Sequence, residues 1–165
     1  MVKNNLKSLL MHITISIISV IVFFFFNMGQ PKWASEEAAR NHHNSMMVVA
    51  VIIIAVSVIL YNSFAGIRLI NQGNIYKNIF SVSLTAILGV LLWVVAFNTD
   101  RIGPSNILLN SQLWQHYTTY NGYSLFFMRE SGINNVYVFL IFSFMPTIAM
   151  GTGIGRKRSY DVLDK

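Results

Sequence analysis

The chain has 165 residues, of which 54% are hydrophobic and only 11% are charged. Soluble domains carry roughly 25% charged residues, so this composition excludes an ordinary soluble domain. The formal charge of +6 comes from basic residues that flank apolar blocks, which argues against a nucleic-acid partner and for a lipid bilayer as partner. No cysteine is present, which excludes disulfides, thiolate metal sites and cysteine nucleophiles.

Four continuous apolar segments are long enough to cross a bilayer as helices, since a span needs about 20 mainly apolar residues. They are residues 9–28, 46–65, 79–97 and 136–154, and none contains Asp, Glu, Lys or Arg. Helices satisfy their own backbone hydrogen bonds in hydrocarbon, whereas the strands of a membrane barrel alternate in polarity. The sequence therefore predicts an all-α fold, a single membrane domain over residues 1–165 that forms an integral membrane four-helix transmembrane bundle.

The first span resembles a signal peptide in one respect, because Lys3 and Lys7 precede it. Its apolar stretch is longer than the usual 7–15 residues or so, and no clean small-x-small cleavage site follows. We therefore expect the span to be retained.

Polar side chains in this span fall near one side of the expected helix. His12, Ser16, Ser19 and Asn27 come close together at about 100° per residue. A polar stripe of this kind should face other helices rather than lipid. We expect it to form interhelical hydrogen bonds, and a water or ion pathway is the alternative.

The distribution of basic residues predicts how the chain is oriented. With the amino terminus inside, the inner segments 1–8, 66–78 and 155–165 carry eight Lys and Arg residues, and the outer loops 29–45 and 98–135 carry four. We expect a multi-pass protein of the plasma membrane with both termini cytoplasmic, and an Asn-, Ile- and Phe-rich composition typical of AT-rich bacterial genomes. The topology anchors are Lys3, Lys7, Arg68, Lys77, Arg156, Lys157 and Arg158.

The first outer loop contains most of the residues that suggest a metal site, and His116 of the second outer loop could join them. Ser35 followed by Glu36 and Glu37 is typical of a helix start. His42, His43 and Glu36 are weak candidate ligands, but adjacent histidines diverge by about 100° on a helix and no HExxH motif is present. We therefore predict no metal site, no cofactor and no catalytic residue.

The second outer loop, residues 98–135, is aromatic-rich and 38 residues long. Loops of such length are often functional. Because Tyr and Trp favour the membrane–water interface, we expect this loop to lie on the outer surface of the membrane or to cap the bundle. A ligand-binding cap is the alternative. Its central aromatic residues are Trp114, Tyr117, Tyr120, Tyr123, Phe126 and Phe127.

Small residues recur at every fourth position in two spans. The fourth span contains Ser143, Thr147, Gly151 and Gly155, and the third contains Ser81, Thr85 and Gly89. This spacing allows two helix backbones to approach closely, either within one chain or between two copies. These seven residues are the predicted helix-packing positions.

Two further features of the fourth span lead to predictions. Pro146 should kink the helix and free a carbonyl one turn earlier. The glycines at 151–155 should end the helix at the cytoplasmic face. They do not form a P-loop, because the final Gly-Lys-[Ser/Thr] is missing.

Ion-coupled carriers usually contain an intramembrane carboxylate, arginine or histidine. The four spans contain no Asp, Glu, Lys or Arg, and His12 lies near one end of the first span, which argues against such a carrier. We expect a non-enzymatic accessory or interaction protein that contacts another membrane protein, or a second copy, through helix packing and the outer loop. One alternative is a small pore or carrier for a neutral or apolar substrate. A second is a membrane enzyme that uses outer-loop residues.

Overall fold

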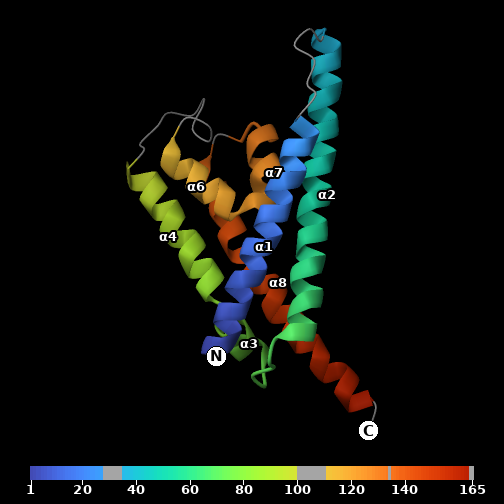
Figure 1. The fold of residues 1–165 in the computed structure, drawn as a ribbon, viewed down its shortest axis with the longest axis vertical. Coiled ribbons are helices and arrows are strands. Elements are labelled where there is room, and N and C mark those ends of the chain that lie inside the picture. The colour runs from blue at the N-terminus through green and yellow to red at the C-terminus, as the bar shows by residue number, and fades with distance from the viewer. Residues whose placement is uncertain (28–34, 100–110, 134, 164–165) are drawn as a thin grey trace.

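The computed structural model describes residues 1–27, 35–99, 111–133 and 135–163 (Figure 1), and within these ranges the chain is all-helical, without a strand. The all-α prediction is therefore confirmed for the described part of the chain. The elements are α1 (Val2–Asn27), α2 (Glu36–Arg68), α3 (Ile75–Phe80), α4 (Leu84–Thr99), α6 (Gln112–Tyr120), the 3₁₀ turn η1 (Gly122–Ser124), α7 (Leu125–Glu130) and α8 (Val136–Leu163).

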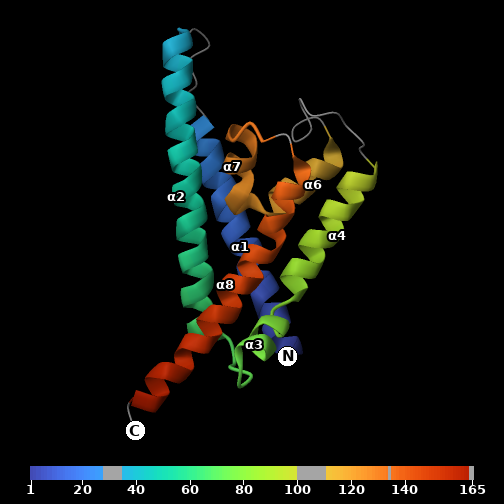
Figure 2. The same cartoon turned by 180° about the vertical axis from the view of Figure 1, so that it is seen from behind.

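Three of these described helices, α1, α2 and α8, are long and apolar enough to cross a membrane, and α4 is a shorter apolar helix. The start of α1, the short helix α3 and the end of α8 lie at one end of the molecule, which we call the termini end (Figure 1). Helices α6 and α7 lie toward the opposite end and enter the space between α1, α4 and α8 (Figure 2). The most extensive helix contacts are those of α8 with α2 and with α4.

Helix α2 begins ten residues before the predicted span at 46–65 and contains 33 residues. The hydroxyl oxygen of Ser35 accepts a hydrogen bond from the Ala38 backbone N–H at 3.2 Å, and Glu36 and Glu37 occupy the first turn. Both features stabilise a helix start. At 1.5 Å per residue α2 is about 50 Å long, so its first turns project beyond the other helices (Figure 1). We call residues 35–45 the α2 arm.

The third predicted span is not one continuous helix. The chain forms a turn at residues 81–83 between α3 and α4, so the long helix begins at Leu84 rather than at residue 79. The Ser81 hydroxyl donates to the Asn78 carbonyl at 2.8 Å, and the Ser83 hydroxyl donates to the Phe80 carbonyl at 3.0 Å. Serine hydroxyls that bond to nearby carbonyls compete with the helical pattern, which explains the interruption.

Two asparagines near the amino terminus connect α1 to this interrupted region. The side-chain amide of Asn4 donates to the Ile70 carbonyl at 2.8 Å and to the Ser81 hydroxyl at 3.1 Å, while its carbonyl oxygen accepts from the Ile70 N–H at 3.1 Å. The carbonyl oxygen of Asn5 accepts from the Leu84 N–H at 2.9 Å, which caps α4. Sequence analysis did not single out either asparagine.

The predicted end of the fourth helix at its glycines is wrong, because α8 continues to Leu163. A Cβ atom on Gly153 would overlap the backbone of Asn62 in α2, and one on Gly151 would overlap Ile79 in α3. These glycines therefore allow neighbouring backbones to approach α8 closely instead of terminating it.

Replacing Asn4 by Ala should destabilise the fold, because three hydrogen bonds are lost and buried partners are left unpaired. We expect the free energy of unfolding to fall by about 2 kcal/mol or more, measured by thermal or detergent-induced unfolding of the purified protein. The matched control is Lys3→Ala, since Lys3 is exposed on the neighbouring position of α1. Equal stability of the two variants would show that the hydrogen bonds of Asn4 do not stabilise the fold.

Candidate functional site

The predicted helix-packing residues meet within one chain. The hydroxyl oxygens of Thr85 in α4 and Thr147 in α8 are 2.6 Å apart, and a Cβ atom on Gly89 would lie 2.9 Å from the Cβ of Ser143. Ser81 instead bonds to Asn4. Most of these positions thus lie along the contact of α8 with α3 and α4, which we call the small-residue seam, and a second copy cannot use the same surface.

The basic residues named as topology anchors are exposed where their side chains are described. The Lys7 ammonium donates to the Arg68 carbonyl at 3.4 Å, which brings the start of α1 beside the end of α2. Lys77 lies in α3, which is also at the termini end (Figure 1). Arg156 follows in α8, and the side chains of residues 157 and 158 lie outside the described part.

The candidate metal ligands do not come together. The Nδ1 atom of His43 lies 3.1 Å from the Glu130 carboxylate at the end of α7, whereas Glu36 is almost two helical turns away along the exposed arm. Arg129 also lies near Glu130, with Nε and the carboxylate 3.5 Å apart. Within the ranges that the structure describes, no three His, Asp or Glu side chains form a group that could hold a metal ion.

The described part of the aromatic-rich loop extends deeper into the bundle than expected for a segment on the membrane surface or for a cap. This part, residues 111–130, enters the bundle as α6, reverses at Asn121 and Gly122, and returns as α7 (Figure 2). We call it the re-entrant segment. The Ser16 hydroxyl donates to the Tyr120 carbonyl at 2.6 Å, and the Tyr120 hydroxyl donates to the Thr85 carbonyl at 2.8 Å. The reversal therefore lies against the middle of α1 and near the start of α4.

Several aromatic rings of this segment are buried inside the chain, so of the two expected positions, the membrane surface or a cap on the bundle, its described part does not take the first. Trp114, Tyr117 and Tyr123 are at most 1% exposed. A Tyr ring gains from burial of its apolar body only if its hydroxyl finds a partner, and here the partners are carbonyls of neighbouring helices. The sequence shows the rings but not these acceptors, which lie on other helices.

Two of the acceptors are on α8, close to Pro146. The Tyr117 hydroxyl donates to the Phe139 carbonyl at 2.5 Å, and the Tyr123 hydroxyl donates to the Phe142 carbonyl. Proline has no backbone N–H, so it leaves the carbonyl four residues earlier without a helical donor. For Pro146 that carbonyl belongs to Phe142. The predicted free carbonyl therefore has a partner, which is Tyr123.

The centre of the bundle contains a polar cluster in which His12, Ser16, Tyr61 and Tyr123 are buried and Tyr120 is partly buried. His12 is 0% exposed, and its Nδ1 atom lies 2.9 Å from the Tyr61 hydroxyl oxygen. Its ring centroid is 4.4 Å from that of Tyr120 and 6.2 Å from that of Tyr123. The cluster joins α1, α2 and the re-entrant segment around one imidazole ring.

His12 and Ser16 of the polar stripe face the interior and form the expected interhelical hydrogen bonds, whereas Ser19 is buried but forms none with the described residues. The side chain of Asn27 lies outside the described part. Sequence analysis missed Tyr61, although a tyrosine in the middle of an apolar run is a usable signal, since polar groups in a span usually face other helices. Chemically, the cluster supplies hydroxyl and imidazole groups that hold helices together.

No protein-family model, curated protein or solved structure gives a significant match to this chain. The described part of the chain is thus an all-helical protein with three helices able to cross a membrane, and its activity has to be inferred from its own geometry.

Removing the Tyr61 hydroxyl tests the polar cluster. Tyr61→Phe leaves the ring in place but leaves His12 without its hydroxyl partner, so we expect a loss of about 1–3 kcal/mol in the free energy of unfolding. The control is Tyr76→Phe, because Tyr76 is 81% exposed and its hydroxyl should contribute little. If both variants unfold like the wild type in detergent, the hydroxyl does not stabilise the cluster.

A methyl group at Gly122 tests the position of the re-entrant segment. In Gly122→Ala the new Cβ would overlap the Ser16 carbonyl, so the reversal has to move away from α1, and we expect destabilisation by about 1–3 kcal/mol. Gly155→Ala is the control, since its Cβ would meet only Ile75 at an ordinary 3.8 Å. Thermal unfolding of the purified variants measures the difference, and a stable Gly122→Ala protein would argue against this packing.

Proposed function

We propose that α1, α2, α4 and α8 are four membrane-spanning helices of a multi-pass protein in the plasma membrane. Large apolar side chains cover their outer faces, which favours a lipid environment over water. Helix α4 has 16 residues and is about 24 Å long, less than the roughly 30 Å of a hydrocarbon core, but α3 and the turn at 81–83 extend it. Representative exposed residues on the four helices are Ile17, Phe25, Ile52, Ile59, Leu91, Val95, Ile141 and Ile148.

In this proposal the termini end is cytoplasmic. The exposed Lys3, Lys7, Arg68 and Lys77 gather there, and positive residues favour the cytoplasmic side. The acidic start of the α2 arm, with Glu36 and Glu37, lies at the opposite end. A bacterial origin fits the composition.

We further propose that the protein is a non-enzymatic accessory protein that binds another membrane protein through the α2 arm. The observation that carries this proposal is the arm itself. Residues 35–41 form helical turns beyond the rest of the bundle, and all of their side chains are exposed (Figure 1). The hydrogen bond between the His43 ring and the Glu130 carboxylate connects the base of the arm to the end of α7. A rigid polar helix held outside the membrane suits contact with the outer part of a partner.

The internal contacts favour this proposal over a pore through a single copy. The space between the helices is filled by large side chains of the described residues, and their hydroxyls bond to carbonyls. The small-residue seam is likewise occupied inside the chain. The filling side chains include Tyr61, Tyr117, Tyr123, Phe139 and Phe142, which are at most 6% exposed.

The orientation is testable by cysteine labelling, because the chain has no cysteine of its own. A membrane-impermeant maleimide should label Glu37→Cys in intact cells and should label Lys77→Cys only after the membrane is permeabilised. Lys3→Cys should behave like Lys77→Cys. Labelling of all three variants in intact cells, or the reverse pattern, would overturn the proposed orientation.

The accessory role is testable with a photo-crosslinking amino acid, p-benzoylphenylalanine, placed in the intact chain. At position 37 we expect one discrete crosslinked membrane protein, identified by mass spectrometry. The control is position 59, where Ile59 is 62% exposed on the apolar face of α2 and should yield lipid adducts. Crosslinks from position 37 to this chain alone, or no crosslink at all, would overturn the accessory role.

A further inference from the structure

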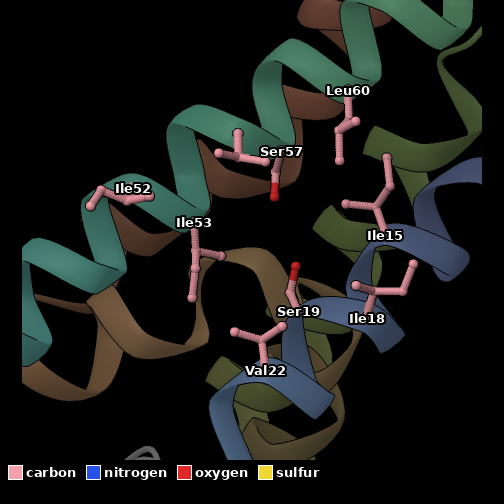
Figure 3. Close-up of a pocket in the computed structure, with 9 residues that line it drawn as sticks. Ile15, Ile18, Ser19, Val22, Ile52, Ile53, Ser57 and Leu60 are labelled. Atoms are coloured by element: carbon pink, nitrogen blue, oxygen red, sulfur yellow. The ribbon is translucent and has the colours of Figure 1, made fainter. Parts of the chain in front are cut away.

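A groove of about 240 Å³ lies between α1 and α2 (Figure 3). Its walls are formed by Ile15, Ile18 and Val22 of α1 and by Ile53 and Leu60 of α2. The rim is open at the surface, since Ile18 and Ile52 are each 54% exposed. If the four helices span the membrane as proposed above, this opening faces lipid.

Two serine hydroxyls interrupt the apolar lining. Ser19 of α1 and Ser57 of α2 are only 6% and 3% exposed, and Figure 3 shows their oxygens pointing toward each other from opposite walls. Within the described part of the chain neither hydroxyl has a hydrogen-bond partner. By contrast, Ser8 and Thr14 on the same helix α1 donate to carbonyls of their own helix.

The depth of these serines determines what can reach them. Each lies within two residues of the middle of its apolar segment, 9–28 or 46–65, so both hydroxyls lie near the midplane of the proposed membrane. A phospholipid head group cannot reach this depth, and a saturated acyl chain offers no hydrogen bond there. An unpartnered hydroxyl in hydrocarbon is unfavourable by several kcal/mol by water-to-alkane transfer, so a ligand that supplies a partner gains affinity.

We propose that this groove binds a membrane-dissolved molecule with a linear apolar body and one carbonyl or hydroxyl oxygen near its middle. One such oxygen accepts a hydrogen bond from Ser19, from Ser57 or from both. The volume equals roughly eight times the 30 Å³ that a water molecule occupies in the liquid, which suits a short length of chain and not a whole helix.

A second groove between α2 and α8 shows why the serines matter. It is larger, at about 540 Å³, and it is also mostly apolar. Its polar groups are already paired, because the side-chain amide of Asn62 donates to the Thr152 hydroxyl at 3.0 Å and to the Ala149 carbonyl at 3.2 Å. That groove therefore serves as a control surface for apolar binding without a free hydrogen-bonding group.

The test uses 10-ketostearic acid as the probe and stearic acid as its competitor, with the purified full chain in lipid nanodiscs and native mass spectrometry as the readout. We expect the wild type to retain the ketone about tenfold more than stearic acid, the gain from roughly one hydrogen bond. In the double variant Ser19→Ala/Ser57→Ala this preference should disappear. Thr152→Val, in the second groove, should keep it.

Folding and occupancy need their own controls. The double alanine variant keeps the shape of the groove, and its thermal unfolding shows whether it folds; Ser57→Leu fills the groove and should remove the ketone preference as well. Equal retention of both probes by the wild type would mean that the groove takes plain acyl chains and would overturn the proposal. An unchanged preference in the double variant, or a dimer that the Leu variant abolishes while no probe binds, would also overturn it.

These outcomes are separate from those for the accessory role. Probe preference is measured on the purified chain alone, whereas labelling and crosslinking at position 37 are measured in cells. A negative ligand result therefore leaves the orientation and the partner tests unaffected.

Discussion

The carbonyl oxygen of Phe142 has no helical donor, because Pro146 lacks a backbone N–H, and it accepts a hydrogen bond from the Tyr123 hydroxyl instead. The interior of the protein is arranged so that this carbonyl has a donor. Where no water is available, a freed carbonyl has to find a donor from another part of the protein. The donor comes from the re-entrant segment, which has to enter the bundle to supply it. Once Tyr123 is there, Tyr117 reaches Phe139 and Tyr120 reaches Thr85. The proline therefore accounts for one of the hydrogen bonds that hold a polar, aromatic segment among apolar helices.

At the termini end, backbone N–H and carbonyl groups also need partners, and there the partners are side-chain amides instead of hydroxyls. Asn4 uses both ends of its side chain on the segment between α2 and α3, and Asn5 caps α4. An amide both donates and accepts, so it can satisfy a backbone N–H and a carbonyl at once. At the break in the third apolar segment, the Leu84 N–H and the Ser81 hydroxyl have partners on α1, which helps to stabilise the interruption.

The sequence was sufficient for those features that depend on one segment at a time. Apolar length and the absence of charge predicted helices, the cap at Ser35 predicted the start of α2, and the spacing of polar residues predicted the inward face of α1. The sequence was insufficient wherever the hydrogen-bond or packing partner of a residue lies on another helix. Tyr117 and Tyr120 are residues typical both of an anchor at the membrane interface and of a segment buried inside a bundle. The choice between them depends on acceptors in α4 and α8.

The small-residue spacing illustrates the same limit, because Gly89 and Ser143 fit together equally well within a chain or between copies. The glycines at 151 and 153 were misread as a helix end, since a close helix crossing and a C-cap both favour glycine. The groove lined by Ser19 and Ser57 cannot be predicted from the sequence of either helix alone, because it lies between them. A serine in a span normally returns its hydroxyl to its own helix, and only the folded chain shows that these two do not.

The re-entrant segment also has a consequence for how the protein is made. It comes between α4 and α8 in the chain, yet it contacts α1 and α2 and donates hydrogen bonds to carbonyls of α8, which follows it in the chain. Its docking sites are therefore complete only after α8 has been synthesised. If the helices insert one by one as spans, the re-entrant segment docks only when they have assembled. Until it docks, the centre of the bundle lacks the side chains that fill it and the Phe142 carbonyl lacks its donor.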